Sequence, residues 1–136
     1  MGQGYAVVGL LPARNAEEDL EGYFASIRGL CDTIVALDDG STDETYAVLE
    51  REPLVKVLLR NPVREDYRGW DDAANRNLLL DAAADLQPEW ILSLDADERL
   101  DETDARSLKH FLTTDALPGC AYGFRHVPMR RDEETF

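Results

Sequence analysis

Residues 33–44 read TIVALDDGSTDE, an apolar, β-branched run that ends in two aspartates. The run predicts a short strand, and the serine and threonine followed by acidic residues predict that a helix begins directly after the loop. Residues 89–98 read EWILSLDADE and show the same order, a strand-forming run and then acidic residues. Each stretch therefore predicts a strand that ends in a carboxylate-bearing loop.

Strand-like and helix-like segments alternate on both sides of these stretches. Further strands are predicted at 5–11 and 54–59, and helices from about Glu17 to Gly29, between Glu44 and Pro53, at 71–86 and at 103–113. Because helices connect the strands, we expect one α/β domain over residues 1–136, a three-layer, mostly parallel sheet with helices on both faces. Residues 120–127 alternate like a fifth strand, and the charged tail from about residue 129 is expected to fray.

The chain is strongly acidic, with 14 Lys and Arg against 28 Asp and Glu and a formal net charge of −14. Such a charge repels phosphate backbones, and no basic patch is evident, so nucleic acid is not an expected partner. The apolar runs are short and the Met1 end has no basic segment before a cleavage site, so we expect neither a signal peptide nor a membrane span. We therefore expect a cytoplasmic protein.

The acidic residues at the predicted strand ends are the main candidates for chemistry. In an open parallel sheet, ligands bind at the carboxyl ends of the strands. Carboxylates gathered there repel one another unless a cation compensates them, and oxygen ligands select Mg²⁺ or Mn²⁺, whose coordination a diphosphate would complete. The alternative is that each aspartate caps the following helix or forms a turn.

Four segments in this order resemble the family 2 glycosyltransferases of the GT-A fold: LLPARNAEEDL, IVALDDGSTDET, GWDDAANRNLLLDAA and WILSLDADERL. The resemblance spans Tyr5 to about Leu100 and depends most on DDGSTD and DADE. It implies an enzyme that binds a nucleoside-diphosphate sugar, with UDP favoured, through Mn²⁺ or Mg²⁺. The enzyme would transfer the sugar with inversion to the hydroxyl of a saccharide or lipid-linked saccharide, and could work at the inner face of the membrane.

The resemblance also implies roles for residues of the first two loops. Pro12, Ala13, Arg14 and Asn15 match the loop that borders the nucleotide base, and Glu17 matches a frequently acidic position in the next helix. Asp39 matches the carboxylate that hydrogen-bonds the base, and Asp38 shapes the same loop.

Further roles are implied near the fourth strand. Asp97 matches the metal ligand of the DXD motif, while Asp95 and Ala96 border the nucleotide sugar. Arg76 matches a basic residue that faces the nucleotide phosphates, although it could equally pair with Asp72, four residues earlier on the same helix.

Two other residues near these motifs have open roles. Glu98 is expected to order the DXD loop. Trp70 could flank the ligand or anchor the start of the following helix.

The catalytic base is not identifiable from the residues. Inverting transfer needs a base for the acceptor hydroxyl, and the resemblance implies a carboxylate downstream of the DXD strand, which we expect beyond Phe136. We therefore expect a chain that stops before the acceptor-binding half and exposes apolar surface, which favours a homo-oligomer. The alternatives are a nonenzymatic module that binds sugar nucleotides and a phosphoaspartate-type phosphatase or receiver domain.

Overall fold

The computed structural model describes residues 4–123 and contains a four-stranded parallel sheet. The strands are β1 (Val7–Ala13), β2 (Thr33–Asp39), β3 (Val55–Asn61) and β4 (Trp90–Ser93), in the order β3-β2-β1-β4. The helices are α1 (Glu17–Ile27), α2 (Thr45–Arg51), α3 (Asp72–Ala84) and α4 (Glu102–Thr114), with a short 3-10 turn, η1, at Tyr67–Gly69. The order of elements confirms the expected α/β fold with a parallel sheet.

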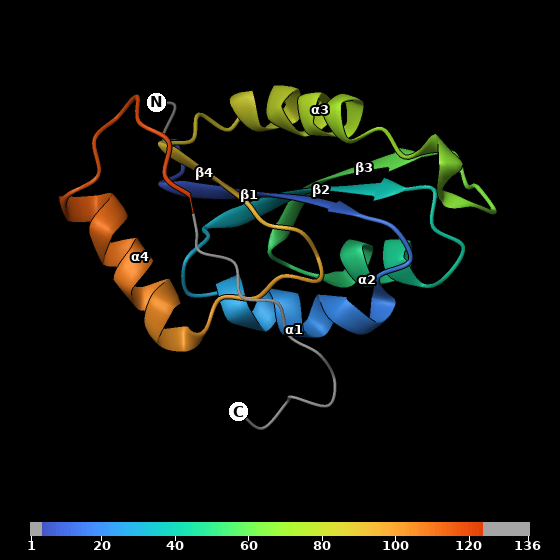
Figure 1. The fold of residues 1–136 in the computed structure, drawn as a ribbon, viewed down its shortest axis with the longest axis horizontal. Coiled ribbons are helices and arrows are strands. Elements are labelled where there is room, and N and C mark those ends of the chain that lie inside the picture. Colours follow the sequence, from blue (N-terminus) through green and yellow to red (C-terminus); the bar gives the residue numbers. More distant parts are fainter. Residues whose placement is uncertain (1–3, 124–136) are drawn as a thin grey trace.

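Helices cover both faces of the sheet, so the molecule has three layers (Figure 1). α3 lies on one face, and α1 and α2 lie on the other. Alternate residues of β1 face the two layers: Leu11 belongs to the core cluster under α1, and Leu10 belongs to the cluster under α3. All seven residues of β1 and of β2 are buried, which explains why their sequences are almost continuously apolar.

β1 extends further than its neighbour β4, and this offset creates space at the carboxyl end of the sheet. The last residue of β4, Ser93, pairs with Leu10, whereas β1 continues to Ala13 beside β2. We expected β1 to end before Pro12, but the strand includes it. Beyond Ser93 only β2 borders β1, so a residue that lacks an N–H group is tolerated there.

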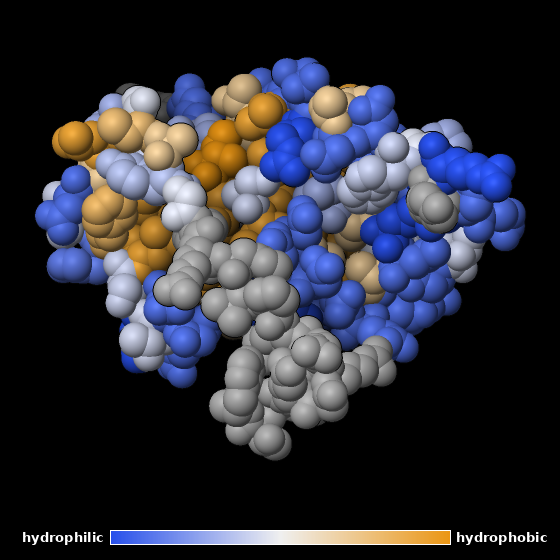
Figure 2. Space-filling model, in the orientation of Figure 1, coloured by the Kyte–Doolittle hydropathy of each residue, from blue (hydrophilic) through white to orange (hydrophobic). Residues whose placement is uncertain are grey.

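Within residues 4–123, β4 is an edge strand that pairs only with β1. Figure 2 shows apolar side chains gathered over β4 and the flank of α3. Exposed apolar residues of these elements include Leu78, Leu80 and Ile91. Such a surface is consistent with the expected self-association, which remains a prediction.

The predicted fifth strand is not found in the part that the structure describes. Residues 120–123 form no strand; Tyr122 instead packs its ring edge-on against Phe111 of α4, with centroids 4.9 Å apart. The hydroxyl of Tyr122 also accepts from the backbone N–H of Leu117 at 3.1 Å, so side-chain contacts of Tyr122 stand here in place of sheet pairing. Residues 124–127 and the expected frayed tail lie outside the described residues.

Among residues 4–123, the structure has no helix with the length and apolar character needed to span a membrane.

Candidate functional site

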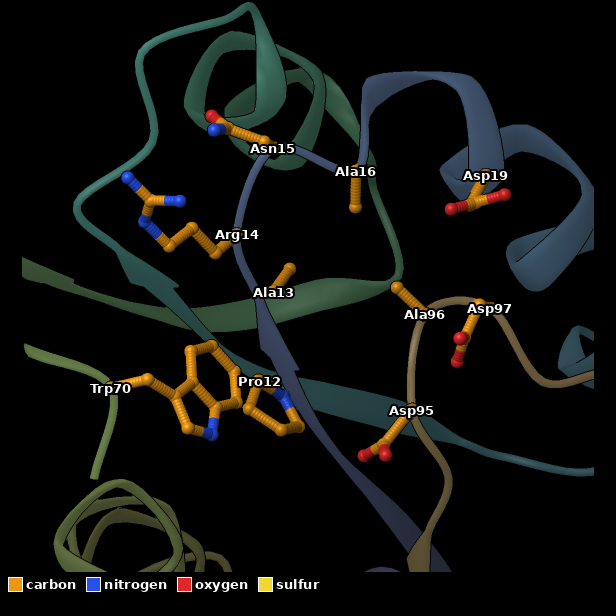
Figure 3. A pocket seen from close by; sticks show the side chains of 10 residues that line it. All are labelled: Pro12, Ala13, Arg14, Asn15, Ala16, Asp19, Trp70, Asp95, Ala96 and Asp97. Carbon is orange, nitrogen blue, oxygen red and sulfur yellow. The ribbon is translucent and has the colours of Figure 1, made fainter. Parts of the chain in front are cut away.

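A pocket of about 390 Å³ opens where the winding of the sheet reverses, between β1 and β4. Its lining comes from the end of β1, the start of α1, the residue after η1 and the loop after β4: Pro12, Ala13, Arg14, Asn15, Ala16, Asp19, Trp70, Asp95, Ala96 and Asp97. In Figure 3 the aspartates lie on one side, Arg14 and Trp70 lie on the other, and Pro12 and Ala13 lie between them. The switch point of a parallel sheet is the expected place for a ligand.

The loop after β4 presents the two aspartates of DADE to the pocket. Leu94 and Ala96 are buried in the core under α1, whereas Asp95 and Asp97 are exposed. Two hydrogen bonds close the loop: the backbone N–H of Glu98 donates to the carbonyl oxygen of Asp95, and Oε1 of Glu98 accepts from the backbone N–H of Asp95 at 2.7 Å. Glu98 therefore orders this loop, as predicted.

Asp95 and Asp97 form one side of the pocket, its acidic wall. The closeness of their negative charges is unfavourable. Partial burial raises the pKa of Asp95, and the negative charges of Glu98 and Asp97 raise it further, against the opposing charge of Arg76. Asp19, on α1, adds a third carboxylate to the lining. The wall is therefore suited to a ligand that brings positive charge.

Arg76 lies on α3 near this wall but does not line the pocket. Its Nη1 donates to Oγ of Ser93, and its Nη2 lies 3.6 Å from Oδ1 of Asp72. The helical ion pair considered as an alternative is therefore formed. The charge of Arg76 also acts on Asp95, while the expected contact of Arg76 with nucleotide phosphates remains a prediction.

Asp39, at the end of β2, is held in an internal ion pair. Its side chain is 1% exposed; Nη1 and Nη2 of Arg64 donate to Oδ1 and Oδ2, each at 3.0 Å, and Nδ2 of Asn61 donates to Oδ1 at 2.6 Å. Burial raises the pKa of Asp39, but the hydrogen bonds from Arg64 and Asn61 and the charge of Arg64 outweigh burial and place it below its ordinary value. Contact between Asp39 and a nucleotide base remains a prediction.

Asp38 precedes Asp39 in β2, so its side chain lies on the opposite face of the sheet from that of Asp39. It is fully buried, and its Oδ2 lies 3.6 Å from Nε of Arg60. Among the described residues neither of its carboxylate oxygens accepts a hydrogen bond. The guanidinium of Arg60 also stacks on the ring of Tyr46, 3.9 Å from its centroid.

The segment from Ser41 to Thr45, the first residue of α2, holds the pocket loop after β1 in place. Oγ of Ser41 accepts from the backbone N–H of Asn15, and Oγ1 of Thr45 accepts from that of Ala16. Oδ1 of Asn15 in turn accepts from the backbone N–H of Thr42. The bond from Ala16 satisfies the N–H of the N-cap residue of α1, and the three bonds together connect the loop after β1 to the segment after β2.

Asp43 has the structural role considered as an alternative for the acidic residues. Its Oδ1 accepts from the backbone N–H of Thr45 at 2.9 Å and from the Thr45 hydroxyl at 2.6 Å. Its Oδ2 accepts from the backbone N–H of Glu17 at 3.3 Å. Asp43 therefore binds backbone at the start of both α1 and α2.

The structure brings seven of the predicted site residues together in the pocket: Pro12, Ala13, Arg14, Asn15, Asp95, Ala96 and Asp97. Glu17, Asp38, Asp39 and Arg76 do not line it. Glu17 is exposed and meets Asp43 through its backbone. The roles in ligand binding assigned to all eleven residues remain predictions.

Sequence reasoning missed three residues that shape the site: Asp19, Arg64 and Arg99. Asp19 lies in the first turn of α1, shortly after the pocket loop that follows β1, and this closeness in sequence was a usable signal. Arg64 reaches back from the loop after β3 to Asp39, and its carbonyl oxygen accepts from Nη2 of Arg14 at 2.8 Å. Arg99 reaches α1 from the loop after β4. Neither arginine stands in a pattern that reveals its partner.

Two mycobacterial proteins are similar to this chain in sequence. The chain is 31% identical over 100 residues to the uncharacterized proteins Rv3786c of Mycobacterium tuberculosis and Mb3815c of Mycobacterium bovis. These residues make up 72% of this chain and 24% of each relative, so the chain spans about a quarter of the relatives' length.

A solved structure shares the fold. The crystal structure of S. aureus TarS 1–349 matches with a TM-score of 0.60 at 19% identity, over 79% of this chain and 32% of that one. This likeness supports the expected GT-A type of α/β fold. Glycosyl transferase family 2 matches residues 10–133. Since that range covers most of the chain, the protein belongs to glycosyl transferase family 2.

Proposed function

We propose that the chain forms the donor-binding part of a glycosyltransferase. It would bind a nucleoside-diphosphate sugar, with UDP favoured, through Mn²⁺ or Mg²⁺, and transfer the sugar with inversion to the hydroxyl of a saccharide or lipid-linked saccharide. Family membership favours glycosyl transfer over the phosphoaspartate alternative. The observation that carries the proposal is the pocket at the β1/β4 switch point, with the DADE aspartates on its wall.

The residues of the pocket fit a divalent cation that arrives with a diphosphate. Among the described residues, no three His, Cys, Asp or Glu side chains converge as a complete metal site. Mg²⁺ typically takes only one or two protein carboxylates, with phosphate oxygens and water completing its coordination. Asp97 would hold the ion and Asp95 would lie close to it. Partial burial raises the pKa of Asp95 most, and the repulsion from Glu98 and Asp97 that raises it further would then be relieved.

The pocket separates two chemical environments. Asp95 and Asp97 form its acidic wall, whereas Trp70 and Pro12 form an apolar one (Figure 3). A diphosphate with its cation suits the first, and a flat base or sugar ring suits the second. Arg14 extends from the end of β1 away from the carboxylates, which leaves it placed beside the nucleoside rather than the cation.

A bound cation would stabilise the negative charge that develops on the leaving diphosphate. The chain's own residues would orient that group and add fixed charge near it. Arg76 is held by Ser93 and Asp72 at the edge of the acidic wall, where its guanidinium can turn toward phosphate oxygens. Other parts of the enzyme would bind the acceptor and would supply the base that deprotonates it.

Isothermal titration calorimetry of the 136-residue chain with UDP tests the proposal. Binding is expected in MnCl₂, with affinity at least about tenfold lower in EDTA. Asp97→Asn should remove the gain in UDP affinity that MnCl₂ gives. Asp81→Asn, the same change at an exposed site on α3, should leave that gain unchanged. Equal affinity with and without metal would overturn the role of the cation, and absence of binding in both would overturn the proposed function.

A further inference from the structure

One arginine connects the DADE loop to helix α1. Nη1 of Arg99 donates to the carbonyl oxygens of Ala96 (2.7 Å) and Glu98 (3.0 Å), which lie in its own loop. Its Nη2 donates to the carbonyl oxygen of Asp19, on α1, at 2.6 Å. The guanidinium therefore bridges the two backbone segments that carry the pocket carboxylates Asp19 and Asp97.

A glycine in α1 makes room for this bridge. A Cβ built on Gly22 would lie 2.7 Å from Nε of Arg99, 2.9 Å from Nη2 and 3.1 Å from Cζ. Any side chain at this position would push the guanidinium off the helix. Glycine is a poor helix former, so its presence inside α1 is explained by the space that Arg99 occupies.

The hydrogen bonds of Arg99 go to backbone carbonyl oxygens rather than to carboxylates. The planar guanidinium has five donors in a fixed geometry, so it can contact three carbonyl groups at once, whereas a lysine ammonium has three donors on one atom. Nη2 of Arg99 also lies 4.0 Å from Oδ1 of Asp19. It therefore fixes the loop and adds positive charge beside it, while the carboxylate of Asp97 stays directed at the pocket.

We propose that Arg99, seated on Gly22, is a positioning residue that holds Asp97 against helix α1 in the geometry needed for a metal–diphosphate ligand. The inference rests on the proposed function, because the ligand is the one proposed there. It adds a role for two residues outside the pocket lining. Loss of the bridge should loosen the loop of residues 95–98 and weaken binding of the metal-bound nucleotide.

Gly22→Ala is the sharpest test, because it removes no polar group. Alanine is the better helix former, and the flexible tip of Arg99 can move aside, so the variant should melt at the wild-type temperature or above. Its affinity for UDP in MnCl₂ should nevertheless fall about tenfold, with affinity in EDTA unchanged. Amide exchange of Asp95 and Glu98 should become faster. Gly29→Ala is the matched control, since a Cβ there meets nothing within 4 Å.

Arg99→Lys provides a second variant that keeps the charge. It should show the same loss of affinity and the same faster exchange as Gly22→Ala. Wild-type affinity for UDP with Mn²⁺ in both variants, with unchanged exchange at residues 95–98, would overturn the inference. If the wild-type chain itself shows no Mn²⁺-dependent binding of UDP, the proposed function fails instead, and amide exchange alone still decides whether Arg99 holds the loop.

Discussion

The two acidic loops of this protein, DDGSTD after β2 and DADE after β4, look alike in sequence and differ in structure. Asp39 is buried in an ion pair with Arg64, and its pKa is lowered, although burial alone would raise it. Asp95 is exposed at the pocket, and its pKa is raised by partial burial and by the charges of Glu98 and Asp97. The charge of Asp39 is balanced by Arg64 within the protein, whereas the charge of Arg76 does not outweigh burial and repulsion at Asp95.

This difference indicates which loop is built for a ligand. The β2 loop connects elements: Ser41 and Thr45 bind backbone N–H groups at the start of α1, and Arg64 ties the loop after β3 to Asp39. Its contribution to the pocket is therefore stability and shape. The β4 loop keeps like charges close together at a surface, which is unfavourable unless a cation binds there. Substitutions in the first loop should consequently change stability, and those in the second should change binding.

Arg64→Met should give the largest loss of stability. It leaves the buried carboxylate of Asp39 without its charged partner, and removal of one member of a buried pair is strongly destabilising. We expect the melting temperature to fall by about 10 °C, measured by circular dichroism. The double variant Arg64→Met/Asp39→Asn should recover part of the loss, and a double variant no more stable than Arg64→Met would contradict the pairing.

Asp39→Asn should give a smaller loss that depends on pH. Because the pKa of Asp39 is lowered in the folded state, its ionised form stabilises the fold above the ordinary aspartate pKa of about 3.9, and this stabilisation disappears as the pH falls through the folded-state value. At pH 7 the variant should melt about 6 °C below wild type. The gap should narrow below about pH 4, and a gap that stays constant in thermal scans from pH 7 to 3 would argue against an ionised Asp39.

Thr45→Val should have a more modest effect. The substitution keeps the shape of a fully buried side chain but removes the acceptor for the Ala16 N–H and a donor to Asp43. Loss of a helix-capping group of this kind lowers the melting temperature by about 4 °C. Thr42→Val, at an exposed position, is the comparison variant and should lose less. Equal falls in melting temperature in Thr45→Val and Thr42→Val would contradict a capping role for Thr45.

Asp97→Ala should leave stability nearly unchanged. The side chain is exposed, and its removal relieves repulsion with Asp95, so the melting temperature should stay within about 2 °C of wild type. The same variant should lose the rise in melting temperature that UDP with Mn²⁺ gives the wild-type protein. A large loss of stability without ligand would show that the β4 loop is structural after all.

Much of the fold could be predicted from the sequence. The apolar runs of β1 and β2 and the helical spacing of α1 are local signals, because side chains buried on both faces of a parallel sheet must be apolar in succession. The described part of the expected fifth strand, residues 120–123, forms no strand; there Tyr122 packs on Phe111 instead. Tyr122 remains 43% exposed in this contact, and alternation in the sequence does not distinguish such a residue from one in a strand.

The site was predictable where it follows strand ends and not where it depends on long side chains. Asp95 and Asp97 follow a strand directly, so their position at the rim needs only the topology. The partner of Asp39 lies 25 residues away and reaches it through the full length of an arginine side chain. Arg99 contacts a carbonyl group 80 residues away in the chain. No spacing rule in a single sequence encodes such contacts.

Paramagnetic broadening of backbone amide signals by Mn²⁺ tests most directly which acidic loop binds the cation. In ¹H–¹⁵N spectra of the labelled chain with UDP, substoichiometric MnCl₂ should first remove the signals of residues 95–98 and of Asp19. The signals of residues 39–45 should persist to higher Mn²⁺ concentrations. Loss of residues 39–45 first, or uniform loss of all signals, would contradict a cation site on the DADE loop.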